Sequence, residues 1–409
     1  MIKRSASSRH GATRIDSMSA NDTTNTGMGN LPPRVLMPTL RRINAHAAWC
    51  SLYEFEDVVR GVDDVRMLEL EQGAWFPPRH RIARSLAWHG HHPALTGMNP
   101  GLKSVVVDRE YDVFMFVCMN VWDLLYLNAI HGWQSRCKVK VCFLSEFYSW
   151  QVRQYDHLLR MLSGFDHVLL PFASSAPVVN RAIGKPCHHV PFATDVLRFT
   201  PLPNARRRVV DVLSIGGRSA PVHEQLLRLA ASRDLFYVYD TLPSALLMPT
   251  NPSEHRSLLA NTAKRSRFFV VNEAKFGSSE KDRQSEVGAR YFEGSAAGAV
   301  LLGREPAVPS FREDFPWPDA VLNIRSDGSD VEAVLDSLAG KPEELERISL
   351  RNAVHALRRH DWGHRWDAIL QLTGLMPRAA LGQRLLALET LANQAAPSRL
   401  QPAPARGAR

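Results

Sequence analysis

Residues 211–218 (DVLSIGGR) place two glycines and an arginine directly after a strand-like apolar run. Glycines let the backbone approach a ligand closely, and a helix beginning after Pro221 would favour an anion at its N-terminus. Gly216 and Gly217 would therefore shape an anion site, and Arg218 would offer a planar fork to phosphate oxygens. The alternative is an ordinary tight turn with a surface arginine. The GxGxxG spacing of a dinucleotide site is absent.

A carboxylate on a predicted helix is the second candidate. Residues 289–303 (ARYFEGSAAGAVLLG) place Glu293 on a helix expected over 284–297, which ends in small residues before a buried strand. The small residues let helix and strand pack closely. Glu293 would accept hydrogen bonds from two vicinal hydroxyls, such as those of a ribose, and Glu286 lies on the same helix face. The alternative is a single solvated glutamate.

Two further acidic residues lie in predicted loops, where ligands gather. Glu146 follows the strand predicted over 138–144 (KVKVCFL), and Asp195 lies in the segment 189–201 (HVPFATDVLRFTP) that joins two predicted domains. Both are candidates for the acceptor side of a cleft. For Asp195, capping of the local backbone or pairing with Arg198 is the competing interpretation.

A late segment, 355–366 (HALRRHDWGHRW), concentrates histidine, arginine and tryptophan. Metal binding by its three histidines is conceivable, but flanking arginines disfavour a cation and no carboxylate cluster supports them. A packed junction with Trp362 and Trp366 buried is the preferred interpretation, and no metal site is predicted.

The segment 75–92 (WFPPRHRIARSLAWHGHH) is basic and amphipathic. Its arginines, Arg79, Arg81 and Arg84, lie near large apolar residues, so it is suited to contact an anionic lipid surface or an anionic acceptor. A solvated helix face covering the core of the first domain is the alternative.

Strand-like runs alternate with helical patterns along most of the chain, which predicts parallel sheets in an α/β fold. The Pro-rich, charged stretch 201–208 divides the pattern into two successive Rossmann-like units, and ligands bind such folds at the carboxyl ends of the strands. We therefore expect a disordered tail over 1–33, an N-terminal Rossmann-like domain over 34–200, a linker over 201–208, a C-terminal Rossmann-like domain with closing helices over 209–374, and a C-terminal helix with a low-complexity tail over 375–409.

Length and composition set outer limits. The 409 residues suit two domains, and the 45% apolar content excludes global disorder. Much of the net charge of +9 lies in the two ends, where five basic residues face two acidic ones over 1–34 and five arginines face one glutamate over 375–409. The body is therefore nearly neutral, and no nucleic-acid partner is expected. Five scattered cysteines and an N-terminus without an apolar signal segment predict a cytoplasmic protein.

Taken in order, four segments resemble motifs of the GT-B glycosyltransferases: HVPFATDVLRFTP, VVDVLSIGGR, RYFEGSAAGAVLL and HDWGHRW. The likeness is to the retaining "group 1" class and, within it, to the bacterial spore-protein CgeB/YkvP-like branch. It implies two Rossmann-like domains facing an interdomain cleft, with the acceptor bound by the domain over 34–200 and the nucleotide-sugar donor by the domain over 209–374. It also implies a bacterial enzyme of glycan biosynthesis. It covers residues 187–370 by motif and 34–186 by architecture.

The resemblance also assigns residues. It implies that Glu293 binds the nucleotide ribose and Arg218 the donor diphosphate. The remaining residues that it places in the donor site are Gly216, Gly217, His223, Arg290, Gly298 and Ala299. In this class protein cations and a helix N-terminus neutralise the leaving diphosphate, so no metal or other cofactor is expected besides the nucleotide-sugar co-substrate.

The sequence departs from the family pattern at three positions. His223 stands where the family has a lysine, Ser285 where it has the first of two glutamates, and Ala193 where it has a glycine. Glu286 is one residue away from that first glutamate. The catalytic residues are not assigned.

The expectation is a metal-independent hexosyltransferase that moves a sugar from a nucleotide-diphosphate donor to a glycan, a lipid-linked sugar or a small molecule. Peripheral contact of the protein with the anionic inner face of a membrane is a further expectation. A catalytically degenerate scaffold that binds sugar or nucleotide, and a nucleotide-sugar epimerase of the same fold, are the alternatives.

Overall fold

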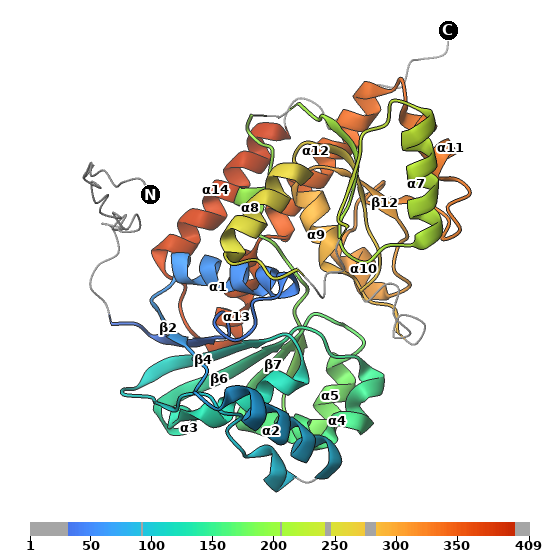
Figure 1. Cartoon of the computed structure of the whole chain (residues 1–409). Coiled ribbons are helices and arrows are strands. Elements are labelled where there is room, and N and C mark those ends of the chain that lie inside the picture. The colour runs from blue at the N-terminus through green and yellow to red at the C-terminus, as the bar shows by residue number, and fades with distance from the viewer. Residues whose placement is uncertain (1–31, 91–92, 205–206, 242–246, 275–283, 397–409) are drawn as a thin grey trace, which may run out of the picture. The chain divides into compact units, whose positions relative to one another are not determined.

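The computed structural model describes residues 32–90, 93–204, 207–241, 247–274 and 284–396 (Figure 1). The elements named below lie within the unit Pro33–Arg409. Nearly all of the tail predicted at 1–33, the end of the C-terminal tail and the pair His91–His92 lie outside the described residues.

The first sheet has six parallel strands in the order β2-β1-β4-β6-β7-β8. They are β1 (Val35–Thr39), β2 (Val65–Glu69), β4 (Tyr111–Cys118), β6 (Cys137–Leu144), β7 (His167–Leu170) and β8 (Cys187–His189). A further two-stranded sheet pairs β3 (Val105–Val106) with β5 (Ile130–His131). We call residues 33–200, which carry these strands, the N-terminal half.

Strand β1 is central, but the sequence pattern does not predict it. Pro38 interrupts the run, and proline cannot donate to a sheet ladder. Pro38 lies beyond the ladder with β4, which pairs only Val35 and Leu36, and it lies opposite Leu68 in the ladder with β2. All five residues of β1 are buried.

The second sheet has five parallel strands in the order β10-β9-β11-β12-β13. They are β9 (Val210–Ser214), β10 (Tyr237–Tyr239), β11 (Ser266–Val270), β12 (Val300–Gly303) and β13 (Leu322–Asn323). We call residues 207–359, which carry this sheet, the C-terminal half. In both halves the second strand in the sequence, β2 or β10, is the edge strand beside the first, β1 or β9. The next strand of the sheet, β4 or β11, pairs with the opposite side of that first strand. The strand order therefore reverses between β1 and β4 and between β9 and β11, where doubly wound sheets bind ligands.

Helices connect the strands in each half (Figure 1). The N-terminal half has α1 (Cys50–Val62), α2 (Phe76–Gly90), α3 (Trp133–Arg136), α4 (Val152–Leu159) and α5 (Ala176–Ile183), with short 3-10 helices that include η3 (Val121–Ala129) and η4 (Ser149–Gln151). The crossover between halves contains α6 (Val196–Phe199). The C-terminal half has α7 (Ala220–Ser232), α8 (Pro252–Ala263), α9 (Ala289–Ala296), α10 (Pro309–Asp314), α11 (Val331–Leu338) and α12 (Pro342–Arg359). Every described helix is too short or too polar to cross a lipid bilayer.

The two faces of the second sheet have different cores. Helices α7 and α11 contact each other over one face, where Val212, Val222 and Leu226 belong to a separate apolar cluster. Helices α8, α9 and α12 belong to the other face, and buried residues such as Leu259 and Phe292 join the same cluster as the core of the N-terminal half. One apolar core therefore runs through both halves.

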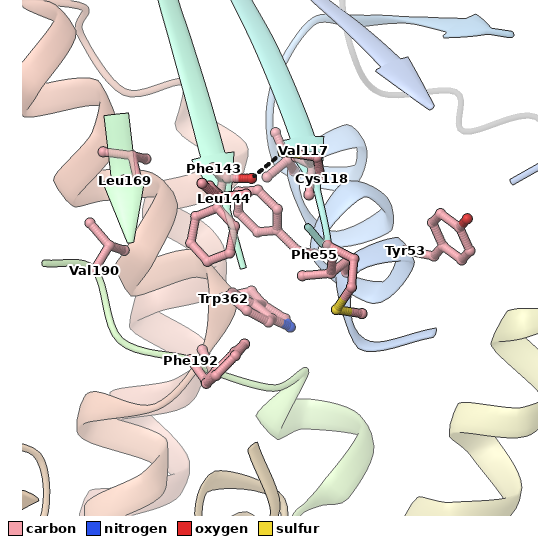
Figure 2. Packing of buried hydrophobic residues seen from close by; sticks show 14 of the residues in the cluster. Tyr53, Phe55, Val117, Cys118, Phe143, Leu144, Leu169, Val190, Phe192 and Trp362 are labelled. Atoms are coloured by element: carbon pink, nitrogen blue, oxygen red, sulfur yellow. Dashed lines mark hydrogen bonds between the residues drawn. The ribbon is translucent and has the colours of Figure 1, made fainter. Parts of the chain in front are cut away.

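The last two helices, α13 (Trp362–Thr373) and α14 (Ala379–Ala395), pack against α1 of the N-terminal half. Figure 2 shows Trp362 of α13 among Phe55, Phe143 and Phe192, and its ring centroid lies 5.0 Å from that of Phe55. The Trp366 indole donates to Asp63 Oδ2 over 2.9 Å. Both tryptophans are fully buried, as the sequence predicts.

The end of the predicted linker is anchored. Arg208 donates to the carbonyl oxygens of Ser266 and Gly298 and to Ser349 Oγ, at 2.5, 2.6 and 2.8 Å. Burial lowers the pKa of Arg208 to about 10. Two Rossmann-like sheets joined by this segment confirm the predicted fold class.

Candidate donor site at the carboxyl edge of the second sheet

The loop after β9 lies where the strand order reverses. Gly216 has a φ of 94°, a conformation that favours glycine. Its amide donates to Asp240 Oδ2, just after β10, over 2.9 Å. The Asn272 side chain, just after β11, donates to the Gly217 carbonyl over 2.9 Å. These two bonds bring the ends of β9, β10 and β11 together around the glycine pair.

Arg218 lies against the same loop. Its Nη1 is 3.8 Å from Asp240 Oδ1, and its guanidinium lies 5.4 Å from the centroid of the Tyr239 ring. Among the described residues neither Arg218 Nη1 nor Asp240 Oδ1 has a hydrogen-bond partner. The guanidinium therefore keeps donor capacity for an anionic group of a ligand.

His223, at the lysine position of the family pattern, lies on α7 beside Arg218. Its Nδ1 is 2.8 Å from the Tyr237 hydroxyl, and its ring packs edge-on against Tyr239. Burial and then the neighbouring Arg218 lower the pKa of His223. The lowered pKa favours the neutral imidazole, which is a hydrogen-bonding group, over a second cation.

Arg290 and Glu293 lie on α9 next to the glycine loop. A Cβ on Gly216 would come within 3.6 Å of Arg290 Nε. Glu293 is 1% exposed, and its two oxygens accept hydrogen bonds from Arg256 and Arg290. Burial opposes ionisation, but Arg290 and Arg256 outweigh it and hold the pKa of Glu293 below its usual range. Glu293 is thus a buried, ionised carboxylate rather than a solvated one.

The partner that the sequence did not reveal is Arg256 of α8. It donates to both oxygens of Glu54, on α1 in the N-terminal half, at 2.9 and 3.1 Å. It also donates to Thr194 Oγ1 over 3.0 Å. The only indication in the sequence of a buried ion pair is that Glu54 interrupts an apolar run (CSLYEFEDVV). This places a charged residue on a helix face that must be buried. Nothing in the sequence pairs it with Arg256.

The structure corrects the prediction that Glu286 shares a helix face with Glu293. Helix α9 begins only at Ala289, after Gly288, and Glu286 precedes it. The chain is extended here because Gly288 packs so tightly that a Cβ would lie 2.8 Å from the Asn272 carbonyl oxygen. Glu286 instead lies where the halves meet, since its Oε1 accepts from the Ser174 amide over 3.3 Å.

Asp195 and Glu146 have their own local contacts. Asp195 caps α6 and accepts a bond of 2.6 Å from Arg384 of α14. Glu146 lies at the carboxyl end of β6, half-buried, and its amide donates to the Met119 carbonyl over 2.7 Å. The Asp195 amide also donates to Glu54 Oε1 over 2.8 Å, so Asp195 adjoins the ion cluster that contains Arg256 and Glu293.

Gly298 and Ala299 lie at the other end of α9, before β12. The Gly298 carbonyl accepts from Arg208 and Ser349, and the Ala299 carbonyl accepts from Asn352 over 2.8 Å. Both are therefore at the amino edge of the sheet, while Gly216 and Arg290 are at the carboxyl edge.

The three histidines of the late segment do not converge. The His355 ring stacks on Trp317, His360 lies among aromatic rings, and His364 Nε2 is 3.0 Å from the Leu357 carbonyl oxygen. Within the described ranges no group of three or more His, Cys, Asp or Glu side chains is arranged to hold a metal.

A small cavity of about 40 Å³ opens at the carboxyl edge beside Asn272. It is lined by Ser219, Val222, Asn272, Glu273, Tyr291, Gly303, Arg304, Ile324, Arg325 and Ser326. Ser219 and Val222 belong to the turn and helix that follow Arg218, and Tyr291 is next to Arg290. The pocket and the charged cluster therefore adjoin.

Comparison with known structures identifies the architecture as the GT-B fold. A trehalose-6-phosphate synthase, OtsA, has a TM-score of 0.53 at 10% identity, over 84% of this chain and 100% of its own. A UDP-forming α,α-trehalose-phosphate synthase from Burkholderia xenovorans has a TM-score of 0.51 at 9% identity, over 84% of this chain and 99% of its own.

One family model also matches part of the sequence. Residues 244–371 match the family described as glycosyl transferase-like. This segment runs through α8, α9 and α12 and includes Arg256, Arg290 and Glu293. A search of curated proteins finds no match.

Proposed function

We propose that this protein is a glycosyltransferase that uses a nucleotide-diphosphate sugar as donor. The observation that carries the proposal is the meeting of the Gly216–Arg218 turn with Arg290 and Glu293 beside a pocket at the carboxyl edge of the second sheet. The match of residues 244–371 to a glycosyl transferase-like family supports it. The segment HDWGHRW supports placing the chain in the CgeB/YkvP-like branch.

In this proposal Glu293 accepts hydrogen bonds from the ribose hydroxyls. A carboxylate offers about four lone-pair sites, so the two arginines leave capacity for hydroxyl donors. Arg256 and Arg290 keep Glu293 ionised and fix its orientation.

Arg218, Arg290 and the N-terminus of α7 would neutralise the diphosphate as it leaves. Charge develops on the leaving group in the transition state, and preorganised cations and amide dipoles stabilise it there. Neutral His223 would donate a hydrogen bond without adding charge. A divalent cation is not required in this scheme. Glu286, which lies where the two halves meet, would lie near the transferred sugar, and Glu146 would lie on the acceptor side.

Calorimetry with uridine, guanosine and thymidine diphosphates tests the donor site. We expect one of the three to bind and Glu293→Gln to weaken that binding. Absence of binding by all three, or unchanged binding and turnover in Glu293→Gln, would refute the assignment. Arg228→Gln is a suitable control, because Arg228 is exposed on α7 and, among the residues that the structure describes, its side chain bonds only to Gln225 of the same helix.

One observation favours the second candidate, a nucleotide-binding scaffold. Both oxygens of Glu293 are already bonded to arginines, and His223 is neutral where the family has a permanent cation. Release of free nucleotide diphosphate from a bound nucleotide sugar separates the candidates, since a scaffold binds the donor without turnover. An epimerase would convert the donor sugar without any acceptor.

A further inference from the structure

A cluster of aromatic side chains lies on the N-terminal half, outside the candidate donor site. Trp88 of α2, Trp122 of η3 and Tyr155 of α4 contact one another, with ring centroids 6.0, 5.9 and 5.7 Å apart. Together with Arg84, Ser85 and His89 they line a pocket. We call these six residues the aromatic pocket.

The three rings are held in place yet accessible. All three are half-buried, and Tyr155 is backed by the buried ring of Phe147 at 6.5 Å. Each ring comes from a different element, and mutual contact fixes their relative orientation. Because one side of the ring cluster packs on the protein and the other side is accessible, the rings offer a rigid surface on which a flat, partly apolar face of a ligand can pack.

The charged members of the pocket carry one sign. The Arg84 guanidinium lies 4.7 Å from the centroid of the Trp122 ring, in a cation–π contact. No acidic residue lines the pocket, and within the described ranges no carboxylate is at salt-bridge distance from Arg84. Residues 76–90 contain no Asp or Glu. The pocket therefore suits a ligand with an aliphatic ring face and a negative charge.

The pocket also lies at the edge of the sheet where a ligand is expected. Trp122 follows the carboxyl end of β4, and η4 and α4 follow that of β6. The Ser149 amide, at the start of η4, donates to Gln284 Oε1 over 2.8 Å. Gln284 in turn donates to Glu286, just before α9. A short chain of contacts thus joins the pocket's own helix to the segment that precedes Arg290 and Glu293.

We propose that the aromatic pocket binds an anionic sugar unit, and that this unit belongs to the acceptor. A pyranose ring presents C–H groups on one face that pack on Trp122, Trp88 and Tyr155. Its carboxylate or phosphate pairs with Arg84, and Ser85 and His89 bond to its hydroxyls. The sugar-binding statement stands on the pocket alone, and its identification as the acceptor rests on the proposed function.

A membrane surface is the competing occupant, because α2 also exposes Ile82 and Leu86. The structure favours the sugar. Side chains that insert into lipid point outward, as Trp75 does at 72% exposure, while Trp88 and Trp122 are half-buried and turned against each other.

Saturation-transfer NMR and calorimetry on the full chain test the proposal with methyl β-glucuronide, glucose 6-phosphate and neutral methyl β-glucoside. We expect both anions to bind about tenfold more tightly than the neutral glucoside, the effect of roughly one charge-assisted hydrogen bond. Arg84→Gln should abolish that preference, and Arg81→Gln, an exposed arginine of the same helix outside the pocket, should retain it. Trp122→Ala should abolish binding of all three, and Trp122→Phe should retain part of it.

Four outcomes are decisive. The proposal would be overturned if the neutral glucoside bound as tightly as the two anions and Arg84→Gln left the binding unchanged. It would also be overturned by association with phosphatidylglycerol-containing vesicles that depends on Arg84 while no sugar binds. Nucleotide diphosphate binding, measured on the same samples, separates this proposal from the proposed function. Sugar binding without nucleotide binding would support the pocket and refute the transferase, and nucleotide binding without sugar binding would refute the pocket alone.

Discussion

Arg256 Nε lies 2.9 Å from Glu54 Oε2, although 202 positions separate the two residues in the chain. Both side chains are buried. Because Arg256 also bonds to Glu293, a single guanidinium joins a carboxylate of the N-terminal half to the one that we propose binds ribose. In the proposed function, donor binding and the contact between the halves would therefore share one ion cluster.

Glu54→Gln should destabilise the protein strongly. Removing one member of a buried ion pair leaves an uncompensated charge, which costs about 3–5 kcal/mol. Urea denaturation monitored by circular dichroism measures this loss. Arg160→Gln, which breaks an exposed pair with Asp156, should leave the unfolding midpoint unchanged. Equal effects of the two variants would contradict the importance of the buried cluster.

Arg218→Ala should weaken donor binding without affecting folding. Loss of one or two charge-assisted hydrogen bonds to a diphosphate corresponds to about 10- to 100-fold in Kd. Stability should change by no more than about 1 kcal/mol, because the ion pair of Arg218 with Asp240 is long, at 3.8 Å. Calorimetry with the preferred nucleotide diphosphate reports the first quantity and thermal denaturation the second. A variant that binds normally would remove Arg218 from the donor site.

Trp362→Ala should leave a cavity at the contact between α13, α1 and β6. Truncation of a fully buried aromatic side chain costs about 3–5 kcal/mol. Trp75→Ala is the matched control, because Trp75 is 72% exposed and should tolerate the same change. Chemical denaturation of both variants checks the difference, and a stable Trp362→Ala protein would show that the junction repacks.

Replacement of two helical glycines by alanine should change the stability of the protein in opposite directions. A Cβ on Gly294 would lie 2.5 Å from Leu301 Cδ2 and 3.3 Å from Phe269 Cγ, so Gly294→Ala should cost about 1–3 kcal/mol through overpacking. A Cβ on Gly382, in α14, meets nothing within 4 Å. Gly382→Ala should therefore stabilise by up to about 1 kcal/mol through helix propensity. Thermal melts of the two variants give the signs directly.

His360 should make the protein less stable in acid. Within the described ranges neither ring nitrogen has a hydrogen-bond partner, and burial, with Arg365 and Arg359 nearby, lowers the pKa of His360 well below its usual value. The unfolded chain binds a proton below about pH 6.5 and the folded chain does not, so stability falls as pH decreases from there. Its slope approaches about 1.4 kcal/mol per pH unit for one proton.

His360→Leu should flatten this slope in urea denaturation measured between about pH 7 and pH 5. The comparison uses the change with pH rather than absolute stability, which the altered side chain also affects. His355, whose pKa burial lowers to about 4, contributes the same trend in both proteins. An unchanged slope would mean that His360 takes up its proton without unfolding.

The fold followed from the sequence because apolar runs and helical patterns alternate, and both sheets appeared where that alternation predicted them. Strand β1 was not predicted, because Pro38 interrupts its apolar run. The glycine turn was recognisable because its residues are adjacent. The pairing of Glu54 with Arg256 was not, because it depends on how two distant helices pack. Glu286 was assigned to the wrong element, since helical spacing does not reveal the tight approach of Gly288 to the end of β11.

The position of α13 and α14 has a consequence for how the chain is made. They cover α1, yet they leave the ribosome long after it: Trp366 follows its partner Asp63 by 303 positions. The first half therefore emerges with the site of Trp362 and Trp366 still empty, and its core closes only after that later segment has been made. Until then, exposed apolar surface favours aggregation. A nascent chain stalled before residue 362 should accordingly depend on chaperones, and expression of residues 33–200 alone should yield insoluble protein.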